Sequence, residues 1–256
     1  MQAAAERRPL AGRVAVVTGS ARNIGRAIAC RLAQDGAAVV VNSRRHAEQV
    51  DAVVNEIHAA GGQAVGCLAD ITDEQAVQRL IGCAVENFGR LDILVNNAAV
   101  RQEGALATTS LAEWRNILAV ILDGAFLCCR TALPYLIASD AATIVNVGGM
   151  TGSSGAQSRV HVVTAKAGLI GLTKALACDL ASDNVTVNLV SPGMVQTERD
   201  TSTAPARPKH HKVHEPLLGR RGTPEEIAAV VRMLCGPDGR FVTGQTLHVN
   251  GGAYLP

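Results

Sequence analysis

Aromatic residues are scarce in this chain of 256 residues, where they make up 2%. A β-sandwich depends on aromatic residues such as Tyr and Trp for its core, so their scarcity argues against that fold. Hydrophobic residues still make up 48% of the chain, which is enough for a full core. Since α/β domains of this length commonly form one unit, we expect residues 1–256 to form a single domain.

The chain also lacks a large excess of charge of either sign, because it contains 24 Lys and Arg residues and 22 Asp and Glu residues. So weak a field does not indicate nucleic acid or an acidic membrane surface as a partner. No run of about 18 uncharged apolar residues occurs, which argues against membrane insertion. The first ten residues carry Arg7 and Arg8 without an apolar stretch, which argues against export. We expect a cytoplasmic protein with a small-molecule substrate.

Paired cysteine spacings are absent as well. The seven cysteines are odd in number and scattered along the chain. They match neither a zinc site nor a disulfide framework. The sequence therefore predicts buried free thiols and no metal site.

A regular alternation of short β-branched runs and helical stretches is present. The runs cover residues 13–17, 38–41, 63–67, 93–95, 143–147, 185–190 and 246–249. Repeated βαβ units of this kind predict an α/β, Rossmann-type doubly wound sheet of seven parallel strands with helices on both faces.

Helix boundaries are marked by local signals. Capping boxes predict helix starts at Ser110 with Glu113, Thr72 with Gln75, and Thr223 with Glu226. Glycines predict the corresponding stops at Gly36, Gly61 and Gly89.

One irregular segment, residues 198–221, interrupts the alternation and contains three prolines. We predict a flexible insertion here, either a plain connector or a substrate lid. A lid would favour an anionic substrate because cationic side chains outnumber acids in it: Arg199, Arg207, Lys209, His210, His211, Lys212 and His214 against Glu198, Asp200 and Glu215.

A glycine turn follows the first expected strand and leads into a helix, an arrangement that cradles phosphate. Its residues are Thr18, Gly19, Ser20, Ala21, Arg22, Asn23, Ile24 and Gly25. The turn resembles the T-G-x-x-x-G-x-G fingerprint of the short-chain dehydrogenase/reductase family, of the 3-oxoacyl-carrier-protein-reductase-like kind. Asn23 replaces the middle glycine, and Asn tolerates the left-handed backbone better than other residues with a side chain.

The resemblance extends over essentially the whole chain. It implies that Asp70, followed by Ile71, accepts from the adenine amino group, and that Asn97 and Ala98 belong to the N-N-A-G motif. It further implies that a loop beside the nicotinamide contains Pro192, Gly193, Val195 and Thr197. Residues 243–252 resemble the family's last strand.

Cofactor choice is indicated at the end of the second expected strand, where an acid would favour NAD. Ser43 occupies the acid's place, Arg44 follows it, and Arg22 lies in the glycine turn. Guanidinium groups match phosphate geometry, so we predict NADP(H) as the cofactor. The alternative is that Arg44 and Arg45 are ordinary solvated charges.

The residues expected at most of the family's catalytic positions are missing from this sequence. Its Y-x-x-x-K pattern falls on Val162 to Lys166, its Ser on Gly149 and its helix Asn on Ile121. Lys166 alone is kept, and in relatives it also bonds the nicotinamide ribose. His161, beside the vacant tyrosine position, is a candidate proton donor. It can equally face away from the nicotinamide, and Arg159 can orient an anionic group.

These observations predict an NADP(H)-dependent oxidoreductase with a degenerate catalytic tetrad and an altered proton path. It would act on a substrate that needs no tyrosine, such as an activated C=N or C=C bond. The alternatives are a non-catalytic NADP(H)-binding subunit or sensor, or a non-redox enzyme reusing the pocket. The resemblance also implies a homotetramer, formed through a helix over 110–138, the helix after His161 and the last strand.

Overall fold

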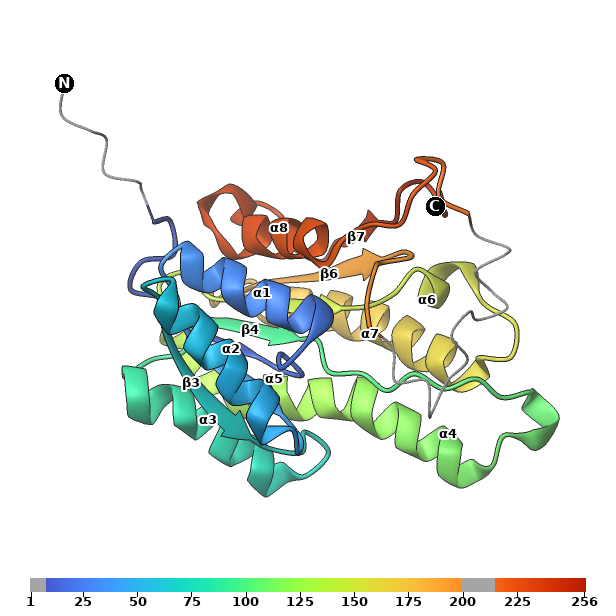
Figure 1. The fold of residues 1–256 in the computed structure, drawn as a ribbon, viewed down its shortest axis with the longest axis horizontal. Helices are drawn as coiled ribbons and strands as arrows, with labels where there is room; N and C mark the ends of the chain where they lie inside the picture. Colours follow the sequence, from blue (N-terminus) through green and yellow to red (C-terminus); the bar gives the residue numbers. More distant parts are fainter. Residues whose placement is uncertain (1–7, 199–214) are drawn as a thin grey trace.

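The computed structural model describes residues 8–198 and 215–256 (Figure 1). Within these residues, seven parallel strands form one sheet in the order β3-β2-β1-β4-β5-β6-β7. The predicted doubly wound sheet is therefore confirmed. The strands are β1 (Val14–Val17), β2 (Ala38–Ser43), β3 (Gln63–Leu68), β4 (Ile93–Asn96), β5 (Thr143–Val147), β6 (Thr186–Pro192) and β7 (Thr246–Val249).

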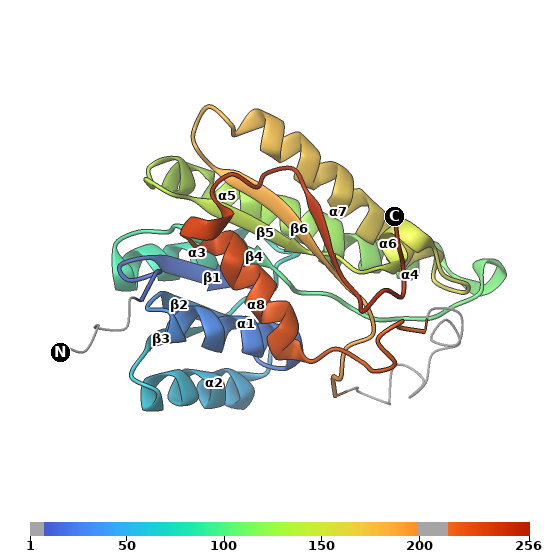
Figure 2. The same cartoon turned by 90° about the horizontal axis from the view of Figure 1, so that it is seen from above.

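Helices cover both faces of the sheet (Figure 2). One face is covered by α1 (Asn23–Gln34), α2 (Ala47–Ala59) and α8 (Pro224–Cys235), and the other by α3 (Glu74–Phe88), α5 (Gly124–Ile137) and α7 (Val160–Asp179). Shorter elements are α4 (Leu111–Leu118), α6 (Thr151–Ser154) and the single turns η1 (Leu106–Thr108), η2 (Ala119–Asp123) and η4 (Pro237–Gly239).

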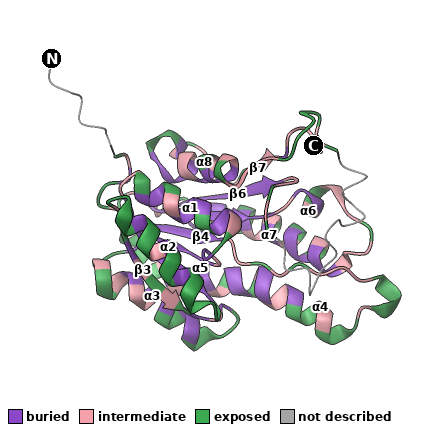
Figure 3. Ribbon diagram, in the orientation of Figure 1, coloured by how far each residue is buried: buried purple, intermediate pink, exposed green. Residues whose placement is uncertain are grey.

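Alternate residues of each strand enter opposite layers of the core. Ala15 and Val17 pack with α1, α2 and α8, whereas Val14 and Val16 pack with α3 and α5. Most of the sheet is buried, as Figure 3 shows, although β3 and β7 at its edges are partly exposed. Burial on both faces explains why the strands appear in the sequence as continuous apolar runs.

Two of the three predicted capping boxes are confirmed, at Ser110 and Thr223. The third, at Thr72, is wrong. The cap of α3 is Asp73, whose carboxylate accepts from the backbone N–H of Ala76 at 2.6 Å. An aspartate side chain is at least as good a cap as threonine, and it moves the helix start by one residue.

The helix predicted over residues 110–138 is continuous from α4 to α5 but contains the π turn η2. The stretch from Leu111 to Ile137, like α7, is long and apolar enough to cross a membrane by length and composition. Such helices also occur in the cores of soluble proteins, so this is weak evidence for a span. Both pack against other elements here, α7 against β6 and α4, and α5 against α3 and β4.

All seven cysteines lie in the described residues and are free thiols. The prediction of buried thiols holds for three of them, Cys128, Cys129 and Cys235. It is wrong for Cys178, which is exposed, while Cys30, Cys67 and Cys83 are half-buried.

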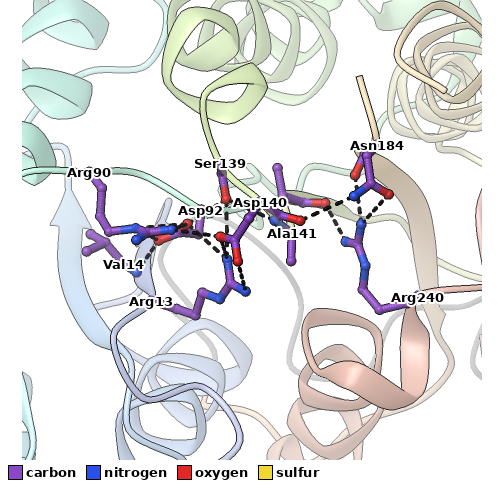
Figure 4. A network of polar contacts seen from close by, with 10 residues as sticks. Arg13, Val14, Arg90, Asp92, Ser139, Asp140, Ala141, Asn184 and Arg240 are labelled. Atoms are coloured by element: carbon purple, nitrogen blue, oxygen red, sulfur yellow. Dashed lines mark hydrogen bonds and ion pairs between the residues drawn. The ribbon is translucent and has the colours of Figure 1, made fainter. Parts of the chain in front are cut away.

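An ion-pair network joins the amino ends of the strands, opposite the glycine turn (Figure 4). Its centre is the buried carboxylate of Asp92, which accepts from Arg90 at 2.6 Å, Ser139 at 2.6 Å and the Val14 N–H at 2.8 Å. Burial alone would raise the pKa of Asp92, but these hydrogen bonds outweigh it and lower the pKa. The network therefore ties β1, β4 and the turn before β5 together.

Removing the Asp92 carboxylate should destabilise the fold strongly. We expect Asp92→Ala to lower the free energy of unfolding by about 2 to 4 kcal/mol, because it leaves the buried Val14 N–H and Ser139 hydroxyl without their acceptor. Urea unfolding at neutral pH measures this. The contribution should be complete above the unfolded-state pKa of about 3.9 and be lost as pH falls through the lower folded-state pKa.

The matched control is Asp140→Ala, which removes a carboxylate of the same network that is 74% exposed. It should cost much less than Asp92→Ala because solvent screens the pair. Equal losses for the two variants would contradict a special role of the buried carboxylate.

Candidate functional site

The glycine turn between β1 and α1 is tightly closed. Gly19 has a φ of 61°, in the left-handed region. A Cβ on Gly25 would lie 2.3 Å from the Gly19 carbonyl oxygen and 2.5 Å from Nδ2 of Asn97. No side chain fits there, so the first turn of α1 approaches the end of β1 as closely as a phosphate cradle requires.

The loop after β4 holds this turn in place. Asn97 Nδ2 donates to the carbonyl oxygens of Thr18 at 2.9 Å and Gly19 at 3.0 Å. In return, the Thr18 hydroxyl accepts from the N–H groups of Asn97 at 2.9 Å and Ala98 at 3.1 Å. Asn42 at the end of β2 accepts from the Gly19 N–H at 3.1 Å. The carboxyl ends of three strands therefore fix the cradle.

Asn23 adopts the left-handed conformation expected for it, with a φ of 53°. Its side chain also exchanges two hydrogen bonds with the backbone of Glu198: Nδ2 donates to the carbonyl oxygen at 3.1 Å, and Oδ1 accepts from the N–H at 2.9 Å. A glycine would supply the conformation without these bonds. Asn23 thus fastens the loop after β6 to the cradle.

The segment predicted as a lid, residues 198–221, is described at its ends. Residues 199–214 lie outside the described residues, so the choice between a lid and a plain connector stays a prediction.

A cavity of about 530 Å³ opens at the carboxyl ends of the strands, where doubly wound sheets bind their ligands. The structure brings most of the sequence-predicted site residues together on its walls. They are Gly19, Arg22, Asn23, Ile24, Gly25, Ser43, Arg44, Asp70, Ile71, Asn97, Ala98, Lys166, Pro192, Gly193, Val195 and Thr197.

Basic side chains gather at the end of the cavity beside β2. Arg22 precedes α1, and Arg44 follows β2 and lies 3.7 Å from the Asp70 carboxylate. Ser43, at the position of an NAD-binding acid, is buried in the cavity wall. This end therefore offers two guanidinium groups where an NAD site would offer a carboxylate.

Lys166 projects from α7 to the other end of the cavity. The residue is 8% exposed, and its amine donates to the Val147 carbonyl oxygen at 2.7 Å. Burial, and after it the charges of Arg101 and Arg159, lower the pKa of Lys166 to about 7. A substantial share of this amine is therefore uncharged at neutral pH, so it can both give and take a proton.

Hydrocarbon groups occupy two of the positions that the sequence pattern assigns to catalytic residues. Val162 is 4% exposed on the cavity wall and packs in one apolar cluster with Ile121, Ala165 and Leu189. At the third position, a Cβ on Gly149 would meet no atom within 4 Å, so this position is open space. None of these residues can donate a proton through its side chain.

Two predicted residues, His161 and Ser20, do not line the cavity. His161 is fully buried, and its Nδ1 accepts from the Val162 N–H at 2.9 Å. Adjacent helical residues point about 100° apart, and Val162 takes the cavity side. The structure therefore leaves His161 off the cavity wall, and its role as a proton donor stays a prediction. The Ser20 hydroxyl is used within the turn, where it donates to the Val17 carbonyl oxygen at 2.7 Å.

The sequence reasoning missed Arg101, which lines the cavity near Lys166. Its Nη1 donates to the Thr197 hydroxyl at 3.2 Å, across the cavity from the loop after β4. The N-N-A-G resemblance ends at Ala99, so no motif marked this residue. Its nearness to that motif was the one available signal.

Comparison with known proteins identifies the family. The family model described as enoyl-(acyl carrier protein) reductase matches residues 19–254. A 3-oxoacyl-acyl-carrier-protein reductase from Staphylococcus aureus is 37% identical over 241 residues, 94% of this chain and 98% of that protein. The BbsD subunit of a hydroxy(phenyl)methylsuccinyl-CoA dehydrogenase from Thauera aromatica is 38% identical over 95% of this chain and 97% of its own length.

Solved structures agree with this result. A dehydrogenase/reductase from Sinorhizobium meliloti superposes with a TM-score of 0.91 at 39% identity, covering 97% of this chain and 98% of that one. A short-chain dehydrogenase from Burkholderia cenocepacia, solved in complex with NADP, gives a TM-score of 0.88 at 35% identity, covering 96% and 99%. The chain belongs to the short-chain dehydrogenase/reductase family.

The two hydrogen bonds between the Asn23 side chain and the Glu198 backbone, called the Asn23 clamp below, predict the local stability of the loop after β6. Asn23→Gly keeps the left-handed backbone but removes both hydrogen bonds to Glu198. We expect amide hydrogen exchange of residues 195–198 to become about 10-fold faster, which corresponds to about 1.4 kcal/mol of lost protection. Exchange in the glycine turn should change little, because Asn97 still holds it.

The control is Asn184→Gly, which changes another Asn with a φ of 58° at the far end of the sheet. Hydrogen exchange followed by mass spectrometry compares the two variants. Unchanged exchange at residues 195–198 in Asn23→Gly would show that the Asn23 clamp does not stabilise this loop.

Proposed function

We propose that this protein is an NADP(H)-binding oxidoreductase that works without the family's tyrosine and serine. The observation that carries the proposal is one cavity that combines a complete phosphate cradle, an acid-free basic end and the buried Lys166 amine. The NADP complex of the Burkholderia cenocepacia relative supports the choice of cofactor.

The residues on the cavity wall fit this cofactor. The cradle from Gly19 to Gly25 would hold the pyrophosphate at the start of α1. Arg22 and Arg44 would bind the 2′-phosphate, and Asp70 would accept from the adenine amino group. Lys166 would bond the nicotinamide ribose. Bound NADPH supplies a hydride, and the protein supplies orientation and a proton.

The proton path must differ from the family's usual one, since Gly149 and Val162 carry no acidic proton. Lys166 is the titratable side chain retained from that machinery, and its lowered pKa lets its Nζ hold or release a proton near neutral pH. An activated C=N or C=C bond, which needs less help than a ketone, is the substrate class that this arrangement favours. Such a substrate would be a small molecule.

A second candidate function is a non-catalytic NADP(H)-binding subunit or sensor. It is favoured by the apolar cluster in which Ile121 and Val162 lie together, because this cluster excludes the water that a proton relay needs. The Thauera aromatica relative carries the word subunit in its name, which fits this alternative. The intact cradle disfavours a non-redox enzyme that has discarded the dinucleotide.

A homotetramer is the proposed assembly. Large apolar side chains are exposed on α5, at Phe126, Tyr135 and Ile137, and Phe241 is exposed before β7. Exposed apolar surface of this kind is typical of an interface. The resemblance implies subunit contacts on the helix over 110–138, which contains α5, on α7 and on the last strand.

The basic end of the cavity predicts that NADPH binds more tightly than NADH. Arg22→Ala and Arg44→Ala should each weaken NADPH binding by about 1 to 3 kcal/mol, because a charge-assisted bond to the 2′-phosphate is lost, and should affect NADH little. Fluorescence titration measures both affinities. Arg31→Ala, on the exposed side of α1, is the control and should change neither. Equal affinity of the native protein for the two cofactors would disprove the 2′-phosphate site.

Because Gly149 and Val162 offer no hydroxyl group, we expect the protein to reduce ordinary ketones very slowly. Gly149→Ser combined with Val162→Tyr should partly restore this activity, since general acid catalysis is typically worth about 10² to 10⁴ in rate. Gly149 has room for the hydroxyl, and adding Ile121→Asn would open the apolar cluster further.

Turnover of a panel of activated ketones with NADPH tests this prediction. Val162→Ile is the control, because it enlarges the side chain without adding a proton donor. Ketone reduction by the native protein at ordinary rates would refute this prediction.

A further inference from the structure

Three basic side chains gather at the end of the cavity where Lys166 lies. Arg101 comes from the loop after β4, Arg159 directly precedes α7, and Lys166 lies within α7. All three side chains line the same cavity. The contact of Arg101 with Thr197 places its guanidinium beside the loop after β6, where the resemblance puts the nicotinamide.

The charge at this end is predominantly positive. The charged groups that act on the Lys166 amine in the described residues are Arg101 and Arg159, and both disfavour its protonated form. The acids that line the described cavity are Asp70, Glu103 and Glu198. Asp70 lies at the opposite end, beside Arg44, and neither Glu103 nor Glu198 is among the groups that act on the Lys166 amine. An anion bound beside Lys166 would therefore enter a favourable field.

We propose that Arg101 and Arg159 form a subsite for an oxyanion of the substrate, a carboxylate or a phosphate next to the bond that accepts the hydride. The proposal rests on the proposed function, because it places the substrate in the cavity that would hold the cofactor. Guanidinium groups are suited to this task, since their forked N–H groups match planar oxyanions.

The cofactor's own phosphates do not account for these two arginines. The cradle and the pair formed by Arg22 and Arg44 provide for the phosphates at the other end of the cavity. A neutral ketone would find no hydroxyl at Gly149 or Val162, whereas an oxyanion would find guanidinium donors nearby. An oxyanion there would also offset the two charges that act on Lys166, so the amine would keep its proton for the reaction.

Small probes test the subsite in the NADPH-loaded protein. We expect oxalate to bind saturably and oxamide, its neutral isostere, to bind about 10- to 100-fold more weakly, as for the loss of a charge-assisted hydrogen bond. Inorganic phosphate is the third probe. If phosphate binds more tightly than oxalate, the substrate carries a phosphate group. If oxalate binds more tightly than phosphate, the substrate carries a carboxylate. Equal binding of oxalate and oxamide would overturn the proposal.

Variants locate the subsite. Arg101→Gln and Arg159→Gln should each weaken oxalate binding about 10- to 100-fold and leave NADPH affinity within about threefold. Arg101→Lys keeps the positive charge but loses the forked N–H groups. Its affinity for oxalate should lie between that of the Gln variants and that of the native protein. Arg115→Gln is the matched control, because it removes one positive charge from an exposed position on α4 outside the cavity.

The outcomes separate this proposal from the proposed function. Normal NADPH binding without oxalate binding would overturn the subsite alone. Failure of the native protein to bind NADPH would overturn the proposed function itself. An equal loss of oxalate binding in Arg115→Gln would show a general effect of net charge and would also overturn the subsite.

Discussion

The contact between Thr18 and Asn97 is the constraint on which the site depends. Each residue satisfies the backbone of the other's loop, so the carboxyl ends of β1 and β4 are locked together. This lock brings Asn97 against Gly25, where a single added carbon would collide. The cradle, the start of α1 and the floor of the cavity follow from that close approach. The ion-pair network around Asp92 secures the opposite ends of the same strands.

At the other end of the cavity, hydrocarbon side chains pack beside one buried amine. Ile121 and Val162 pack together as hydrocarbon, yet Lys166 stays buried beside them. Its pKa is lowered in the folded state, so the unfolded chain binds more protons between about pH 7 and 10.4, and stability rises with pH across that window. At neutral pH the buried amine therefore costs stability, which an apolar residue would avoid. A buried amine with this cost supports the proposed role of Lys166 in binding a ligand or moving a proton.

Much of the fold could be predicted from local patterns, because each strand is a β-branched run and most helix starts carry their own cap. The prediction at Thr72 failed because the neighbouring Asp73 caps the helix one residue later, through the Ala76 N–H, while the Thr72 hydroxyl donates to Asp70. The clamp by Asn23 could not be predicted, since its partner lies 175 residues away. His161 and Val162 are adjacent in sequence, and the rotation of α7 decides which of them faces the cavity. Arg101 carries no motif, and its place beside Lys166 arises from the fold alone.

We propose that the dinucleotide groove is intact and that packed hydrocarbon stands where relatives have a proton relay. A high-resolution crystal structure of the NADPH complex tests it most directly. We expect the 2′-phosphate between Arg22 and Arg44, Lys166 within hydrogen-bond reach of the nicotinamide ribose, and direct contact between Ile121 and Val162 without intervening water. A chain of ordered water running from Lys166 past Ile121, or a nucleotide bound outside the cradle, would contradict the account.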